Sequence, residues 1–205
     1  MNVDDKWSID KEKALGHKYR PYFKKLEDSK WQKLSYEERC EVLQKVEEYE
    51  ALTHNRPVAI FQTRDSMPLQ SRGYYSPKSN TITQNYQYTM SNSSEMALQN
   101  VLHEGRHGYQ WDCIKNPQNH PEISESQRKE WEQNLNNYIS AQSAEDKMQY
   151  FMQPVEVDAR TYAQSEAKRY EQFRQQHKRT DGLDQHSTSV DLSTKSKIEK
   201  RGRTQ

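Results

Sequence analysis

Apolar residues recur every three to four positions through most of this chain, which is the spacing of a helix that buries one face. Between residues 35 and 53, the apolar positions with this spacing are Tyr36, Cys40, Leu43, Val46, Tyr49 and Leu52. Ser35 and Glu38 form a capping-box pattern at the start of the series. The pattern therefore predicts one long amphipathic helix. The charged residues 1–34 carry aromatic residues without a clean period, and we expect them to form helical segments that lean on the domain.

Three more helices are predicted in the second half of the chain. Asparagine and serine residues at 92–94 supply N-caps for a helix over about 93–113. In the next predicted helix, over 124–139, the apolar positions with helical spacing are Trp131, Leu135 and Tyr138. The last helix begins near Pro154, because proline suits the first turn of a helix.

Strand patterns are confined to residues 57–85. Residues 57–62 (PVAIFQ) form a short β-branched and aromatic run after a turn, and residues 73–85 (GYYSPKSNTITQN) have the form of a strand, a turn and a second strand. The expected fold class is therefore α+β and mostly helical, with a short antiparallel sheet beside the helix at 93–113.

Composition limits how much of the chain can fold around one core. Only 31% of the 205 residues are hydrophobic, which is low for a globular protein. Beyond His177 the sequence turns to Ser, Thr, Lys, Gln and Gly with almost no large apolar residues, as in disordered termini. We expect N-terminal helical segments at 1–54, a main domain at 55–177 and a disordered polar and basic tail at 178–205.

Charge does not identify a partner, because 31 Lys and Arg residues are nearly balanced by 30 Asp and Glu residues. The first twenty residues lack the apolar run of a signal peptide, and no stretch approaches the roughly 18 apolar residues of a membrane span. We therefore expect a cytoplasmic protein with no membrane contact, although non-classical secretion would leave no mark in the sequence. Cys40 and Cys113 are too few and too far apart for a disulfide framework and are expected to be reduced.

Candidate chemistry lies at residues 103–107 (HEGRH), an H-E-x-x-H pattern inside the helix predicted at 93–113. His103 and His107 lie one turn apart on the same helical face, which is the arrangement that two zinc ligands need. Glu104, about 100° round the helix, can reach a water on the metal rather than the metal itself. The metal would lower the pKa of that water, and Glu104 would take its proton as the general base.

The alternative is that both histidines face solvent or are hydrogen-bonded core residues. Against it, Gly105 inside the motif costs the helix about 1 kcal/mol relative to alanine, and such a cost usually has a packing or access reason. We therefore expect another part of the protein to approach the helix closely at Gly105.

A catalytic zinc needs a third protein ligand and an open fourth position. The best downstream candidate is Glu156, because Ala159 and Ala163 fall on the same side of its helix and would let it pack closely against the motif helix. Asp158 is the rival ligand and points about 200° away from Glu156. Taken alone, Glu156 also suits the first turn of a helix, where the helix dipole favours acidic residues. We favour Glu156, because two protein ligands would leave the site incomplete.

HEGRH, followed on a later helix by Glu156 in the segment EVDA, resembles the gluzincin class of zinc metallopeptidases. In that class, H-E-x-x-H is completed by the glutamate of an E-x-x-A or E-x-x-x-D segment. The chain is most similar to small bacterial zincin domains of the ImmA/IrrE-like and polymorphic-toxin kinds, over roughly residues 55–175. The resemblance implies a zincin-like fold, a protein or peptide substrate, zinc ligands at His103, His107 and Glu156, and Glu104 as the general base.

The chain also departs from the gluzincin pattern. Many gluzincins have an acidic residue after E-x-x-A that holds a ligand histidine, whereas this chain has Arg160, so Asp158 or another carboxylate would have to make that contact. Oxyanion stabilisation is expected from Tyr109, Tyr162 or Arg160. In peptidases of this class, the strand before the motif helix can pair with an extended substrate. Residues 81–85 (TITQN) are the candidate strand, unless they only cover the core.

Two other functions fit the sequence. Zinc could support a protein-binding domain that has no catalytic activity. Alternatively, the basic segment at 195–203 (KSKIEKRGR) could bind a partner or the phosphates of a nucleic acid. Such runs are common in solvated termini, so nucleic acid is the less favoured partner.

Overall fold

The computed structural model describes residues 3–68, 70–141 and 147–172, and the tail expected at 178–205 lies outside them. The chain divides into two units, residues 1–167 and 168–205, and the described part of the second unit, 168–172, is helical. The described elements are α1 (Val3–Lys25), α2 (Asp28–Trp31), α3 (Tyr36–Thr53), β1 (Ile60–Arg64), β2 (Gly73–Ser76), β3 (Thr81–Asn85), α4 (Tyr86–Thr89), α5 (Glu95–Lys115), the 3-10 helix η1 (Pro117–Asn119), α6 (Glu125–Asn136), α7 (Lys147–Phe151) and a helix over 154–172, here called the Glu156 helix.

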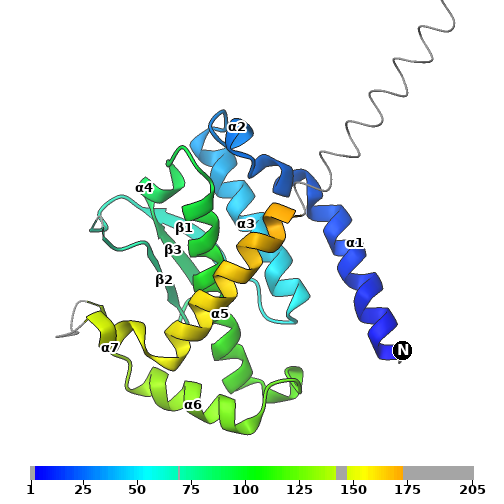
Figure 1. The fold of residues 1–205 in the computed structure, drawn as a ribbon, viewed down its shortest axis with the longest axis vertical. Coiled ribbons are helices and arrows are strands. Elements are labelled where there is room, and N and C mark those ends of the chain that lie inside the picture. Colours follow the sequence, from blue (N-terminus) through cyan, green and yellow to red (C-terminus); the bar gives the residue numbers. More distant parts are fainter. Residues whose placement is uncertain (1–2, 69, 142–146, 173–205) are drawn as a thin grey trace, which may run out of the picture. The chain divides into compact units, whose positions relative to one another are not determined.

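The fold is mostly helical α+β, as predicted, with a small three-stranded sheet packed against α5 (Figure 1). α3 packs against α1, β1 and α5, and α6 packs against the C-terminal half of α5. α5 is therefore the element around which the sheet, α3 and α6 are arranged, while α1 packs on α3. No described helix is long and apolar enough to cross a membrane.

The predicted capping box at the start of α3 is present. Ser35 Oγ accepts from the Glu38 backbone N–H at 3.2 Å, and the Ser35 N–H donates to Glu38 Oε2 at 2.8 Å. α6, in contrast, ends at Asn136 rather than at the predicted residue 139. The Asn137 side chain donates to the carbonyl of Gln133 at 2.8 Å, and such local side-chain bonds compete with helix continuation. Tyr138 therefore leaves the helix, which matters for the site described below.

The sheet has the order β1-β3-β2 and is mixed rather than purely antiparallel. β2 and β3 form the predicted antiparallel hairpin, and Asn80 in its turn has a φ of 47°, a conformation that asparagine tolerates well. β1 pairs with β3 in parallel. After β1 the chain crosses to the opposite edge of the sheet and forms β2, and the hairpin then places β3 between β1 and β2.

The position of β3 overturns the expectation that residues 81–85 pair with a substrate. β3 is hydrogen-bonded to β1 on one side and β2 on the other, and all five of its residues are buried. A strand paired on both sides has no free edge to offer. In the described sheet the edge strands are β1 and β2.

Gly105 lies where α5 meets a buried ion pair. Arg56 donates to both carboxylate oxygens of Glu47, at 2.6 and 2.8 Å, and both side chains are almost fully buried. A Cβ placed on Gly105 would lie 2.9 Å from Glu47 Oε2 and 3.0 Å from Arg56 Nη2. The close approach expected from a glycine inside the motif is thus made by this ion pair.

Replacing Gly105 tests this packing. We expect Gly105→Ala to lower the free energy of unfolding by about 1–3 kcal/mol, because the methyl group would displace a buried charged pair. The matched control is Gly16→Ala in α1, where a Cβ would meet nothing within 4 Å. The control should raise the free energy of unfolding by up to about 1 kcal/mol through helix propensity. Urea unfolding followed by circular dichroism measures both, and a Gly105→Ala protein as stable as wild type would contradict the packing argument.

Candidate metal centre

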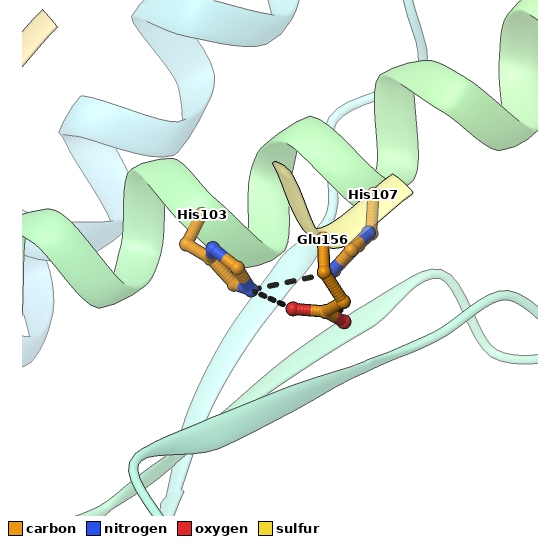
Figure 2. Close-up of side chains that lie close together, drawn as sticks. All are labelled: His103, His107 and Glu156. Carbon is orange, nitrogen blue, oxygen red and sulfur yellow. Dashed lines mark hydrogen bonds and ion pairs between the residues drawn. The ribbon is translucent and has the colours of Figure 1, made fainter. Parts of the chain in front are cut away.

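His103 and His107 project from one face of α5, as their spacing predicts (Figure 2). Their Nε2 atoms are 3.2 Å apart. Glu156, in the first turn of the Glu156 helix, brings its buried carboxylate to both rings: Oε2 lies 3.3 Å from Nε2 of His103, and Oε1 lies 3.4 Å from Nε2 of His107. Among the described residues, these three form a group that could hold a metal ion.

The spacing of this group suits a metal ion. Two ligand atoms bound tetrahedrally at zinc's usual distances of about 2.0–2.2 Å would lie about 3.3–3.5 Å apart. The two imidazole Nε2 atoms are 3.2 Å apart and lie 3.3 and 3.4 Å from different oxygens of Glu156, and one ligand atom from each residue can be chosen so that all lie within 4.8 Å. Moreover, Oε2 of Glu156 is buried and makes no hydrogen bond among the described residues. A buried carboxylate oxygen left this way is costly, and a cation at this position would compensate it.

Gln110 fixes which nitrogen of His107 can bind a metal. The amide nitrogen of Gln110 donates to the carbonyl of Val155 at 3.0 Å and to Oδ2 of Asp158 at 2.7 Å. The amide oxygen therefore faces Nδ1 of His107, at 2.9 Å. Because an amide oxygen can only accept, Nδ1 carries the proton, and the lone pair of Nε2 is directed to the metal group.

The charges of the group also favour a cation. Burial tends to lower the pKa of His107, but the Glu156 and Glu104 carboxylates outweigh it and raise the pKa to about 9. Burial likewise tends to raise the pKa of Glu156, yet His103 and His107 hold that pKa well below its usual range. A site that holds an extra proton this firmly is also well suited to a divalent cation.

Asp158, the rival ligand, is engaged elsewhere. Nε and Nη2 of Arg106 donate to its two carboxylate oxygens at 2.8 and 3.0 Å. Asp158 contacts the metal group through Gln110, which bonds both Asp158 and His107. The contact with a ligand histidine that was expected of Asp158 is therefore indirect. Sequence reasoning missed Gln110, although its i, i+3 spacing from His107 was a usable signal.

Glu104 lies beside the group without joining it. The backbone of Tyr75 in β2 is near enough to the Glu104 carboxylate to favour the charged form. The side chain is buried, and burial raises the pKa of Glu104 above its ordinary value against the opposing effect of the two histidines. A carboxylate with a raised pKa near a metal group is suited to accept a proton at neutral pH.

Of the three residues predicted to stabilise an oxyanion, the structure brings one, Arg160, close to Glu156. The hydroxyl of Tyr109 donates to Glu122 at 2.6 Å, and the hydroxyl of Tyr162 bonds Glu50 and His54. Arg160 is close, with Nη1 3.7 Å from Oε2 of Glu156.

Tyr138, which the sequence did not predict as a site residue, contacts the metal group. The hydroxyl of Tyr138 donates to Oε1 of Glu156 at 2.6 Å, and the ring of Tyr150 lies 6.3 Å from that of Tyr138. The pattern had placed Tyr138 on the apolar face of a helix. Its role depends on α6 ending at Asn136, which hydrophobic spacing does not reveal.

The role given to Gln110 can be measured as zinc affinity. We expect Gln110→Met, which keeps the side-chain volume but removes the bond to His107, to weaken zinc binding about 10- to 100-fold, the usual effect of losing a group that orients a ligand. Gln99→Met is the control, because Gln99 lies on the same helix and its amide donates to the exposed Glu95 at 3.1 Å, away from the metal group. Competition with a chromogenic chelator gives both affinities. Equal zinc affinities in Gln110→Met and wild type would show that Gln110 does not orient the ligand.

Comparison of this chain with protein-family models, with curated proteins and with solved structures finds no match. The chemistry of the site therefore has to be inferred from its own residues and geometry.

Proposed function

We propose that this chain is a zinc-dependent peptidase. The observation that carries the proposal is the meeting of two imidazoles and one buried carboxylate whose ligand atoms lie close enough together to hold one metal ion. Imidazole nitrogens favour zinc over magnesium or calcium, which prefer oxygen ligands. Catalytic zinc sites use three protein ligands and keep a fourth position open, whereas structural sites use four. The metal group in the described residues has three.

Glu104 is the general base in this proposal. Zinc held by His103, His107 and Glu156 would supply a Lewis acid that polarises the scissile carbonyl and makes water easier to deprotonate. Glu104 would accept the proton from the attacking water and pass it to the leaving amine. Its burial and its raised pKa both suit this role.

Two donors near Glu156 suit the stabilisation of a developing oxyanion. Tyr138 already places its hydroxyl at the carboxylate of Glu156, and Nη1 of Arg160 makes no hydrogen bond among the described residues. We assign the oxyanion role to this pair in place of Tyr109 and Tyr162, because the hydroxyls of Tyr109 and Tyr162 bond residues outside the metal group.

The substrate in this proposal is a protein or peptide in an extended conformation. β2 is an edge strand that packs against α5, and the backbone of its Tyr75 lies near the Glu104 carboxylate. A peptide that added a strand beside β2 would pass the general base, so β2 takes the place first expected of residues 81–85.

Metal content tests the ligand assignment. We expect about one zinc per chain in purified wild-type protein, and loss of most of it in His103→Ala, His107→Ala and Glu156→Ala. Asp158→Ala is the control for Glu156→Ala, and it should keep much more metal because Asp158 reaches the site only through Gln110. Elemental analysis after dialysis measures all four. Full zinc retention in Glu156→Ala would remove Glu156 from the ligand set.

Replacing Glu104 separates catalysis from metal binding. We expect Glu104→Gln to keep its zinc and its Tm, while peptide hydrolysis falls by about 10²–10⁴-fold, because the amide cannot accept a proton. Glu95→Gln, an exposed glutamate in the first turn of the same helix, is the control and should keep full activity. Hydrolysis is read as new peptide termini after incubation of a cell lysate with each protein. If Glu104→Gln and wild type give the same termini at the same rate, a metal-supported binding domain becomes the better account.

A further inference from the structure

The side chain of Arg106 lies between two tyrosine rings that belong to different helices. Its guanidinium carbon is 4.4 Å from the ring centroid of Tyr109 on α5 and 4.7 Å from that of Tyr162 on the Glu156 helix. The ring of Trp131 on α6 lies further away, at 5.8 Å. A planar guanidinium stacks on aromatic faces, and the contact is stronger where water is excluded. Because the side chain of Arg106 is only 14% exposed, these rings fix where its guanidinium lies.

The edge of the same guanidinium holds Asp158. Nε and Nη2 of Arg106 each donate to one carboxylate oxygen, at 2.8 and 3.0 Å, and such a paired arrangement fixes orientation as well as distance. Asp158 and Glu156 lie about 200° apart round the Glu156 helix. The helix, which crosses α5 in Figure 1, is therefore held at two points of its circumference, at Glu156 beside the histidines and at Asp158 by Arg106. Two such points fix the rotation of the helix against α5.

A chain of hydrogen bonds leads from Arg106 to one histidine of the metal group. Oδ2 of Asp158 accepts from Nε of Arg106 at 2.8 Å and from Nε2 of Gln110 at 2.7 Å. The amide oxygen of Gln110 lies 2.9 Å from Nδ1 of His107. Because Asp158 orients the amide of Gln110, the residue that orients Asp158 also acts on His107.

The two tyrosines that flank Arg106 are themselves anchored outside the metal group. The hydroxyl of Tyr109 donates to Glu122 at 2.6 Å, and the hydroxyl of Tyr162 bonds Glu50 on α3. Both tyrosines were expected to stabilise an oxyanion, but their hydroxyls are directed to these carboxylates and their rings to Arg106. The rings are therefore held in place from α3 and from the segment before α6.

We propose that Arg106 is a positioning residue of the metal centre, which holds Asp158 so that the Glu156 helix keeps Glu156 at the histidines. This inference rests on the proposed zinc site and adds a requirement to it: the second variable position of the H-E-x-x-H motif has to be arginine in this chain. Lysine carries the same charge but has neither the paired donors nor the planar face that stacks between two rings.

Zinc affinity measures the positioning. We expect Arg106→Met, which keeps a long apolar stem but removes the charge and both bonds to Asp158, to bind zinc about tenfold more weakly. Arg106→Lys should bind zinc about threefold more weakly, because it keeps the charge without the paired bonds. The control is Arg64→Met, since Arg64 also lies over a tyrosine ring, 5.9 Å from the centroid of Tyr74, but is exposed and belongs to β1. Competition with a chromogenic chelator gives the affinities, and circular dichroism verifies that each variant is folded.

Two further readouts distinguish positioning from a loss of stability. Arg106→Met and Asp158→Asn remove the same contact, so each alone and the two combined should weaken zinc binding about tenfold, whereas independent effects would multiply to about a hundredfold. The second readout replaces zinc by cobalt(II), whose visible absorption reports the geometry of its ligands. We expect the cobalt spectrum of Arg106→Met to differ from that of wild type, and that of Arg64→Met to match it. If Arg106→Met does not fold, Arg106→Lys and Asp158→Asn provide the same measurements.

The outcomes separate this inference from the proposed function. The positioning role is overturned, and the metal centre stands, if Arg106→Met binds zinc as wild type does, if the losses in the double variant multiply, or if zinc binding weakens without a change in the cobalt spectrum. A wild-type protein that binds no zinc refutes the metal centre and this inference with it. Zinc binding that depends on Arg106 in all three readouts, combined with no new peptide termini from wild-type protein in a lysate, supports the positioning role and refutes the peptidase.

Discussion

The packing of the Glu156 helix against α5 is the interaction on which the rest of the site depends. Arg106 and Gln110 on α5 both bond Asp158, and Gln110 also bonds the carbonyl of Val155. Val155 packs into a core with the side chains of α5 and α6. Ala159 and Ala163 are buried, and small residues at these positions let two helices approach closely. These contacts fix the position of Glu156 between the two histidines.

The opposite side of α5 is fixed by equally specific contacts. Gly105 lies so close to the buried Glu47–Arg56 pair that a side chain at this position would force the pair to shift. Gly108 accepts the ring of Tyr75, with its nearest atom 3.4 Å from where a Cβ would be. A buried ion pair is a weak source of stability, because the desolvation of both charges offsets their attraction. The ion pair instead fixes the positions of neighbouring segments. Glu47 bonds Arg56 and also accepts a hydrogen bond from the backbone N–H of Ala59, just before β1.

The carboxylate of Glu156 contacts both the two histidines of the metal group and residues outside it. On one side it faces the imidazoles of His103 and His107, and on the other it accepts from Tyr138 and lies near Arg160. Each partner favours the charged form of this carboxylate, although the group is buried. The same residue therefore belongs to the candidate metal group and is hydrogen-bonded to Tyr138, which lies just after the end of α6.

The sequence by itself determined the helices α3 and α5, the starts of α6 and of the Glu156 helix, the β2–β3 hairpin, the motif face of α5 and the need for a close neighbour at Gly105. These features depend on local spacing, capping and backbone freedom, which are encoded within about twenty residues. Only the tertiary structure decided that Glu156 joins the histidines while Asp158 pairs with Arg106, that β3 is central, and that Tyr138 rather than Tyr109 or Tyr162 reaches the site. These outcomes follow from how one helix rotates against another, where a strand is inserted into a sheet and where α6 ends. Each is set by contacts between residues far apart in the chain, which periodicity along the sequence does not record.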